Sequence, residues 1–389
     1  MRILIFNTNY YPNIIGGAEI STQLLAETLS TLDNQVWVCT IADVEKREVI
    51  NGVNVVYTNY RNIYWAFKGT NLKWKKAIWH FLDIYNFRFA GYFQKLINEI
   101  KPDVIHTNNI CGFSCVVWHV AKSMKIPIVH TLRDYYLLCY KSTMFKNGKS
   151  CCKQCIDCKL SSMVTKMISQ NIDSVVGISR FILDNHLECG YFGKTKYCEV
   201  IYNSIEITKS TVDRNPYTIG YMGSIIPSKG IERLISDFCK LEVKNYTLEI
   251  AGDCNTDYVA FLKNKYSSPN IKFVGRVSAK DFLSHISLLV VPSEWREPFG
   301  RVVAEAIKTK CPVFVSNRGG MPELVNHDNG RVFSLEDNDS LYNLLTEYTK
   351  GKMHFSFEID ENRFDRFVIA NKYVRIYRKL VKDNLPDGR

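Results

Sequence analysis

Short apolar runs alternate with amphipathic segments along most of the chain. The run Arg2–Asn7 predicts a strand, and apolar spacing over Ile20–Leu32 predicts a helix after a glycine loop. The same order starts again with a strand at Thr218–Met222 and a helix over Ile231–Leu241. Continuous apolar strands between amphipathic helices are typical of parallel sheets covered on both faces. The pattern predicts an α/β protein with two doubly wound, Rossmann-like parallel-sheet domains.

A polar stretch over Ile207–Tyr217 is the best candidate for a domain boundary. We therefore expect an N-terminal domain over residues 1–208 and a C-terminal domain over residues 209–362. Residues 363–389 predict a basic amphipathic helix that packs back toward the N-terminal domain. Two such domains would face each other across a cleft, because open α/β sheets bind ligands at the carboxyl ends of their strands.

Charge and apolar content narrow the partners and the compartment. The 389 residues carry a formal net charge of +11, which favours nucleotide phosphates, acidic lipid headgroups or nucleic acid. Nucleic acid is the weakest of these, because no basic recognition motif is present. No apolar run reaches about 18 residues, so we expect no membrane-spanning helix. A strand begins at Arg2, so we expect no signal peptide and a cytoplasmic protein.

The segment Val290–Ala306 combines an apolar run, a charged loop and the start of a helix. Pro298 suits the first turn of that helix, where the N–H that proline lacks would have no helical partner. Glu297 lies just before the helix, and Glu305 lies about two turns into it. A helix N-terminus suits a phosphate, and a carboxylate two turns along can accept hydrogen bonds from sugar hydroxyls. The alternative is a surface helix with two solvated glutamates.

Three further features lie where strands give way to loops. Gly16 and Gly17 follow the first strand, where backbone amides can approach a diphosphate, although glycines often serve only a turn. Lys229 follows the first strand of the second half and can meet a phosphate as a point charge, or lie on the surface. His130 ends a strand close to Asp134, where a lone histidine is often structural. The expected cleft is lined by Gly17, His130, Lys229, Glu297 and Glu305.

The segment Tyr60–Lys101 is both aromatic and basic. Large apolar residues recur at helical spacing from Trp74 to Leu96, which predicts an amphipathic helix. Such a helix can lie in the interface of an anionic membrane, which would make the protein peripheral on the inner face of the cell membrane. A core helix with a solvated lysine edge is the alternative.

Five cysteines lie close together in a loop-like segment over residues 139–158. Two of the spacings are CxxC, as in zinc sites. A structural zinc ion, reduced thiols and a disulfide are all compatible with this pattern, although disulfides are rare in the cytoplasm. The candidate ligands are Cys139, Cys151, Cys152, Cys155 and Cys158.

The motifs together resemble those of glycosyltransferase family 4, which are retaining sugar-nucleotide transferases of the GT-B fold. The most specific match is Glu297-Pro298-Phe299-Gly300 with Glu305, which is similar to the family's E-x7-E motif. Supporting matches are Gly16-Gly17-Ala18-Glu19, Pro102-Asp103-Val104-Ile105-His106, His130 with Asp134, Ser179-Arg180-Phe181, Gly223 with Lys229-Gly230, and Gly319-Gly320 with Pro322-Glu323. The cysteine segment resembles an insertion in one subset of the family.

The resemblance implies a role for each motif residue. Glu305 would hold the ribose hydroxyls, and Glu297 would contact the donor sugar and stabilise oxocarbenium charge. Lys229 would offset the charge of the leaving diphosphate, and His130 would touch the donor sugar. No metal is required for catalysis in such enzymes, because cations and helix dipoles stabilise the charge. The nucleotide-sugar site implied is Gly16, Gly17, Gly223, Ser224, Lys229, Pro298, Phe299, Gly300 and Glu305.

One departure from the family pattern concerns the diphosphate. Family members commonly carry arginine at the position of Ser224, and serine cannot supply the positive charge that an arginine offers the diphosphate. Arg296, Arg301 or Arg318 are the candidate replacements.

The function expected is retaining transfer of a sugar from a UDP- or GDP-sugar to a glycan or lipid-linked acceptor in surface polysaccharide biosynthesis. The alternative is a non-catalytic relative that binds nucleotide sugars.

Overall fold

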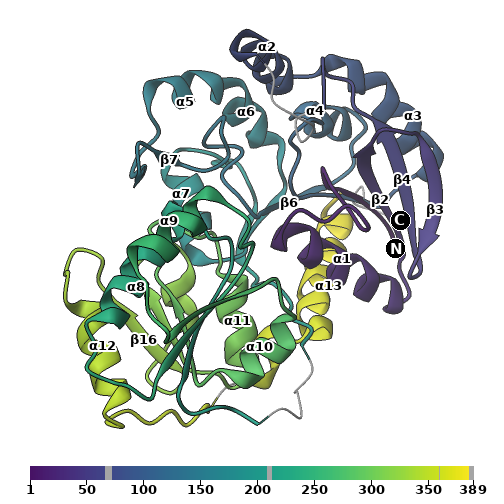
Figure 1. Cartoon of the computed structure of the whole chain (residues 1–389). Helices are drawn as coiled ribbons and strands as arrows, with labels where there is room; N and C mark the ends of the chain where they lie inside the picture. The colour runs from purple at the N-terminus through teal and green to yellow at the C-terminus, as the bar shows by residue number, and fades with distance from the viewer. Residues whose placement is uncertain (66–71, 208–212, 359, 385–389) are drawn as a thin grey trace. The chain divides into compact units, whose positions relative to one another are not determined.

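The computed structural model describes residues 1–65, 72–207, 213–358 and 360–384. The chain divides into two compact units, each built on its own sheet (Figure 1). Unit 1 comprises Met1–Met144, Cys151–Ser204 and Asp365–Arg389, and unit 2 comprises Phe145–Ser150 and Ile205–Phe364. The boundary expected at residues 208 and 209 lies outside the described residues. The predicted class of two Rossmann-like α/β domains is confirmed, because the sheet of each unit is wholly or mainly parallel.

Unit 1 contains an eight-stranded sheet in the order β10-β9-β6-β5-β1-β2-β4-β3. All neighbours are parallel except β3 and β4. The sequence pattern did not predict β3, because its exposed edge position gives it few buried residues. The strands are β1 (Arg2–Phe6), β2 (Gln35–Ala42), β3 (Lys46–Ile50), β4 (Val53–Asn59), β5 (Val104–Thr107), β6 (Ile128–Leu132), β9 (Ser174–Gly177) and β10 (Tyr197–Val200).

The helices of unit 1 include the one that ends the described chain. That helix, α13, packs on α1, and Tyr373 and Tyr377 reach the buried core of the sheet. The Tyr377 hydroxyl bonds His106 Nδ1 at 2.7 Å, which ties the helix to β5. The helices are α1 (Gly17–Thr31), α2 (Lys73–Ile84), α3 (Ala90–Ile100), α4 (Val116–Ser123), α5 (Ile156–Ser161), α6 (Met163–Ile168), α7 (Arg180–Glu188) and α13 (Arg366–Asp383), with 3-10 turns η1 (Phe87–Phe89) and η2 (Ser169–Asn171).

The single amphipathic helix predicted between Trp74 and Leu96 is wrong. The chain instead forms α2, the turn η1 and α3, because it leaves the helical conformation at Tyr85 and Asn86. The Asn86 N–H donates to Ser114 Oγ at 2.8 Å, and its side chain donates to the Arg61 carbonyl at 3.2 Å. These partners replace the helical hydrogen bonds. Residues 66–71 of this segment lie outside the described part.

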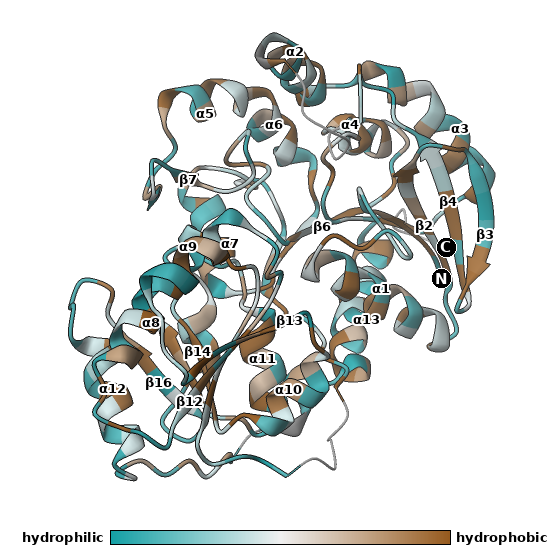
Figure 2. Ribbon diagram, in the orientation of Figure 1, coloured by the Kyte–Doolittle hydropathy of each residue, from teal (hydrophilic) through white to brown (hydrophobic). Residues whose placement is uncertain are grey.

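Unit 2 contains a six-stranded parallel sheet in the order β13-β12-β11-β14-β15-β16. Figure 2 shows these strands as mostly hydrophobic, between helices with one polar face. The strands are β11 (Thr218–Met222), β12 (Thr247–Ala251), β13 (Ile271–Gly275), β14 (Leu288–Val291), β15 (Val313–Ser316) and β16 (Gly330–Phe333). The helices are α8 (Ile231–Cys239), α9 (Asp257–Lys265), α10 (Ala279–His285), α11 (Arg301–Lys308) and α12 (Ser340–Thr349), with 3-10 turns η3 (Pro227–Lys229), η4 (Met321–Leu324) and η5 (Glu361–Phe364).

A short antiparallel hairpin, β7 (Phe145–Lys146) and β8 (Lys149–Ser150), belongs to unit 2 although its flanking residues belong to unit 1. The Ser150 hydroxyl donates to the carbonyl of Glu294 at 2.9 Å.

Across the described residues, none of the helices has both the length and the hydropathy that crossing a bilayer would require.

Candidate active site

Two loops of unit 2 meet because their strands are neighbours. β11 pairs with β14, so the loop that follows β11 lies beside the loop that follows β14. The N–H groups of Glu294 and Trp295 both donate to the carbonyl of Ser228, at 3.1 and 2.9 Å. Gly230 has a φ of +66°, and a Cβ there would lie 2.0 Å from the Pro292 carbonyl oxygen. The close approach of the loops therefore requires glycine at position 230.

This arrangement brings Lys229 and Glu297 together as an ion pair, although 68 residues separate them. Their side chains are only 20% and 17% exposed, so the pair is partly shielded from water. The ammonium group also lies 4.4 Å from the centre of the Trp295 ring, a cation–π contact. The sequence reasoning did not identify Trp295. The pair holds a cation and a carboxylate in fixed positions at the carboxyl ends of the strands.

The backbone of Glu297 is held by a second glycine loop. The Gly320 N–H donates to the Glu297 carbonyl at 2.7 Å. Gly319 has a φ of +67°, and a Cβ at that position would lie 2.2 Å from the same carbonyl oxygen. Any larger residue at position 319 would displace Glu297, so this glycine pair has a positioning role.

The helix α11 begins at Arg301, so the prediction that Pro298 lies in its first turn is wrong. Gly300 takes the N-cap position in the left-handed conformation, and Pro298 lies in the preceding bend. Arg301 Nε, on the first residue of the helix, donates to Glu305 Oε1, one turn further along, at 2.9 Å. Burial raises the pKa of Glu305, and the neighbouring Arg301 lowers it by less. Burial likewise lowers the pKa of Arg301. Shielded charges of this kind are typical of functional sites.

Ser224 is exposed in the loop after β11 and follows Gly223, and its carbonyl accepts from the Tyr221 hydroxyl at 2.7 Å. It brings no charge to this loop. Of the arginines considered as replacements, Arg301 contacts Glu305, and Arg318 contacts Glu336 at 2.7 Å. Lys229 forms an ion pair with Glu297.

In unit 1, Gly16 is the N-cap of α1, and Gly17 is its first residue. The Gly16 N–H donates to Glu19 Oε2 at 2.8 Å. A Cβ on Gly16 would meet no atom closer than 3.8 Å, and its backbone is extended, so packing within the chain does not require glycine here. A diphosphate contact at the start of α1 stays a prediction.

His130 lies inside β6 and is 3% exposed. Its Nδ1 bonds Thr107 Oγ1 at 2.8 Å, and its ring packs between Trp118 and Phe192. Burial lowers the pKa of His130 to about 3, so it is neutral at physiological pH. These contacts account for His130 as a core residue, and a contact with a donor sugar stays a prediction.

Arg133 and Asp134 follow β6 directly, at the edge where open α/β sheets place ligands. Arg133 is buried; its Nε donates to Asn108 Oδ1 at 2.7 Å, and it also bonds Asn203 Oδ1. Asp134 accepts from the Asn109 side chain at 2.6 Å, and burial raises its pKa to about 6. The sequence reasoning assigned no role to Arg133, although its place after a buried strand was the available signal.

The cysteines of residues 139–158 differ in their surroundings. Cys139 and Cys158 are buried, Cys151 and Cys155 are half-buried, and Cys152 is exposed. Burial, with the neighbouring thiols of Cys155 and Cys139, raises the pKa of Cys158 to about 12. In the part of the chain that the structure describes, no three His, Cys, Asp or Glu side chains converge as metal ligands. The two buried members, Cys139 and Cys158, are free thiols in the structure.

Solved structures confirm the GT-B fold. Sucrose-phosphate synthase from Thermosynechococcus elongatus superposes with a TM-score of 0.74 at 17% identity, over 98% of this chain and 99% of that one. Anabaena Alr3699/HepE, solved in complex with UDP and glucose, superposes with a TM-score of 0.71 at 18% identity, over 97% of this chain and 100% of that one.

Sequence comparisons establish the family. Residues 15–209 match the model described as Glycosyltransferase Family 4, and residues 204–363 match the model described as Glycosyl transferases group 1. An uncharacterized 42.6 kDa protein in the cps region of Klebsiella pneumoniae is 36% identical over 97% of this chain and 100% of its own length. The capsular polysaccharide biosynthesis glycosyltransferase CapM of Staphylococcus aureus is 24% identical over 56% of this chain and 62% of its own length. The chain is therefore an enzyme of glycosyltransferase family 4, with the GT-B fold.

Proposed function

We propose that the protein transfers a sugar, with retention at the anomeric carbon, from a nucleotide-sugar donor to a glycan or lipid-linked acceptor in surface polysaccharide biosynthesis. The observation that carries the proposal is the shielded Lys229–Glu297 pair next to the start of α11. Relatives named for capsule synthesis and the cps region support the setting. UDP in the structure of Alr3699/HepE supports the donor class.

Each charged residue of unit 2 has a distinct role in this proposal. The Lys229 ammonium meets the diphosphate and offsets the charge of the leaving group. Glu297 then stabilises the positive charge that develops on the donor sugar ring. Glu305 accepts hydrogen bonds from the ribose hydroxyls, and Arg301 holds its carboxylate in place.

Lys229 and Glu297 neutralise each other in the ion pair. A diphosphate that binds near Lys229 replaces Glu297 as its counter-charge, which frees the carboxylate to face the developing positive charge. The roles of Gly223, Pro298, Phe299 and Gly300 in holding the donor also stay predictions. The roles of Gly16, Gly17 and His130, which lie in unit 1, stay predictions from the family resemblance.

A screen of UDP, GDP and ADP sugars by thermal shift tests donor binding, because a ligand that binds the folded state raises its apparent stability. NMR of the anomeric proton in the product then tests retention. No shift with any nucleotide sugar would refute the donor class, and an inverted product would refute retention.

A non-catalytic relative that binds nucleotide sugars is the second candidate, and Ser224 favours it, because that position lacks the usual cation. Donor binding without transfer to any capsule or lipid-linked acceptor would support this reading. The transfer as we propose it uses no metal cofactor. A structural zinc at the cysteine segment is tested by elemental analysis, and a content well below one per chain refutes it.

We also propose a cytoplasmic location, peripheral on the inner face of the cell membrane. The basic and aromatic helix α2 supports this proposal, because Trp74 and Phe81 are exposed. A lipid-linked acceptor would be found at that surface.

A further inference from the structure

Helices α5 and α6 of unit 1 turn a row of large apolar side chains to solvent. Ile156, Leu160, Met163 and Met167 are each between 65% and 75% exposed. Their spacing of four, three and four residues places them along one face of a helical segment. An exposed apolar row of this size is typical of an interaction surface.

The opposite face of these helices is more polar than the exposed one. Cys158, Ser162, Thr165 and Ile168 are the residues turned inward. A helix that faces water normally buries its apolar face and exposes its polar face. Here the apolar face is exposed and the more polar face is buried, so packing inside unit 1 does not account for the apolar row.

The helix α2 carries a second exposed row, formed by Trp74, Ile78 and Phe81. Their spacing of four and three residues again marks one helical face. The buried Trp79 holds the other face of α2 to the unit, because its Nε1 donates to the Tyr64 carbonyl at 2.9 Å. Anchored in this way, α2 presents its apolar row to solvent.

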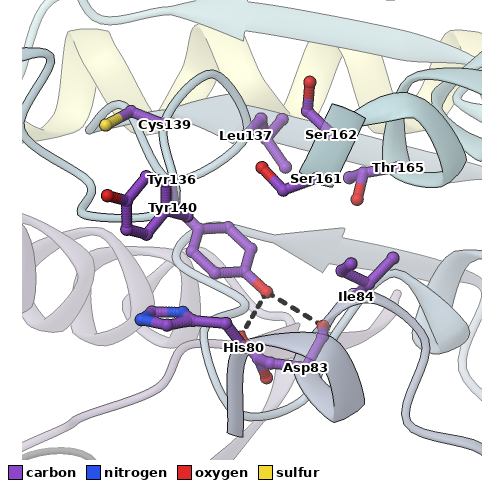
Figure 3. Close-up of a pocket in the computed structure, with 10 residues that line it drawn as sticks. All are labelled: His80, Asp83, Ile84, Tyr136, Leu137, Cys139, Tyr140, Ser161, Ser162 and Thr165. Carbon is purple, nitrogen blue, oxygen red and sulfur yellow. Dashed lines mark hydrogen bonds between the residues drawn. The ribbon is translucent and has the colours of Figure 1, made fainter. Parts of the chain in front are cut away.

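The two rows belong to the same part of unit 1, because α2 and α5–α6 border one pocket (Figure 3). His80 and Asp83 line it from α2, and Thr165 lines it from α6. The Tyr136 hydroxyl donates to Asp83 Oδ2 at 2.7 Å and so links α2 to the loop after β6. The pocket volume of about 40 Å³ suits water molecules rather than a sugar, so the outer apolar rows are the larger feature.

The exposed charges beside both rows are mainly basic. Lys75 and Lys76 lie on α2, and Lys159 and Lys166 lie on α5–α6. Among the described side chains of these helices, Asp157 is the only exposed acidic residue. Apolar rows flanked by lysines are the arrangement by which helices lie in the interface of an anionic bilayer. An acidic headgroup layer complements this charge, whereas a neutral apolar partner does not.

We propose that α2 and α5–α6 together form a docking face for the surface of an anionic lipid bilayer. The apolar rows enter the boundary between headgroups and acyl chains, and the lysines contact the headgroups. This inference extends the proposed peripheral location and assigns the cysteine-bearing segment a role in it. It rests on the proposed function for its setting, but lipid binding itself requires no sugar transfer.

Flotation of the full-length protein with vesicles of phosphatidylglycerol and phosphatidylcholine tests the docking face. The variant Leu160→Gln/Met163→Gln/Met167→Gln removes three apolar anchors and should lower vesicle partitioning by about tenfold or more. The control Val44→Gln/Val49→Gln replaces two equally exposed residues on the β3 side of unit 1 and should stay within about twofold of wild type. Thermal unfolding checks that both variants fold.

A second pair of measurements tests the charge. The variant Lys159→Glu/Lys166→Glu and added salt should each weaken binding to the anionic vesicles, and vesicles of phosphatidylcholine alone should bind less. No wild-type binding to anionic vesicles overturns the proposal. Undiminished binding of the apolar variant also overturns it, as would equal binding to neutral vesicles. Self-association that depends on the same residues, without vesicle binding, would identify an interface between copies instead.

Vesicle binding and donor binding are measured separately, so the docking proposal and the proposed function can be refuted independently. Donor binding by thermal shift depends on unit 2 residues and should be unchanged in the apolar variant. Vesicle binding without donor binding would refute the proposed transfer and support the docking face. Donor binding without vesicle binding would refute the docking face and leave the proposed donor class unaffected.

Discussion

Replacement of Glu305 by glutamine separates the role of this carboxylate in binding from its role in stability. The substitution keeps the size of the side chain and one acceptor oxygen, but removes the charge. Arg301 Nε, which donates to Glu305 Oε1 at 2.9 Å, can still donate to the glutamine oxygen. We therefore expect the free energy of unfolding to change by no more than about 2 kcal/mol.

Donor affinity should change far more. A hydrogen bond to a charged group contributes about 1.5–3 kcal/mol, and the ionised carboxylate can accept one from each of two ribose hydroxyls. Loss of one such bond, with weakening of the other, gives about 3 kcal/mol, or about a 100-fold rise in Kd. Burial raises the pKa of Glu305, so wild-type affinity should fall on acidification at a higher pH than an exposed glutamate would give. The glutamine variant should lack this step.

The assay is calorimetric titration with the nucleotide sugar that most stabilises the wild-type protein, repeated over a range of pH. Urea unfolding of the same preparations measures stability. Glu347→Gln is the matched control, because it makes the same chemical change on the exposed face of α12 and should alter neither quantity. If Glu305→Gln bound the donor within about twofold of wild type, the ribose role would be refuted.

Three further outcomes follow from the contacts described. Lys229→Met should raise the Kd for the donor about 10- to 100-fold by calorimetry, whereas Lys240→Met, which also breaks an ion pair, should not; equal values would exclude a diphosphate role. Burial raises the pKa of Asp83 to about 7, so the folded chain holds a proton that the unfolded chain releases near pH 4, and stability falls as pH rises between these values. Asp83→Asn should flatten this slope in urea unfolding at pH 5 and 8, and parallel profiles would contradict the assignment. Arg133→Leu should lower the free energy of unfolding by about 2–4 kcal/mol, because two buried asparagine oxygens lose their donor, whereas the exposed Arg276→Leu should cost less than about 1 kcal/mol.

Local pattern predicted the elements of the fold but missed features that depend on distant partners. Buried strands such as β11 and β14 were predicted from continuous apolar runs, which need no knowledge of neighbours. The break at Asn86 was missed, because the partner that ends the helix, Ser114, lies 28 residues further along. The position of Pro298 was misjudged for a local reason, since the left-handed conformation of Gly300 cannot be read from the residue alone.

In the candidate site, too, the place of each residue along the chain could be predicted, but its contacts with distant residues could not. That Lys229 and Glu297 each follow a strand could be predicted from the sequence. That they touch depends on β14 lying beside β11, although two strands intervene between them along the chain. Alternating strands and helices are compatible with several strand orders, so spacing alone could not pair these residues; the family resemblance was needed. The contact of Lys229 with Trp295 was missed for this reason, because it exists only once that strand order has brought the two loops together.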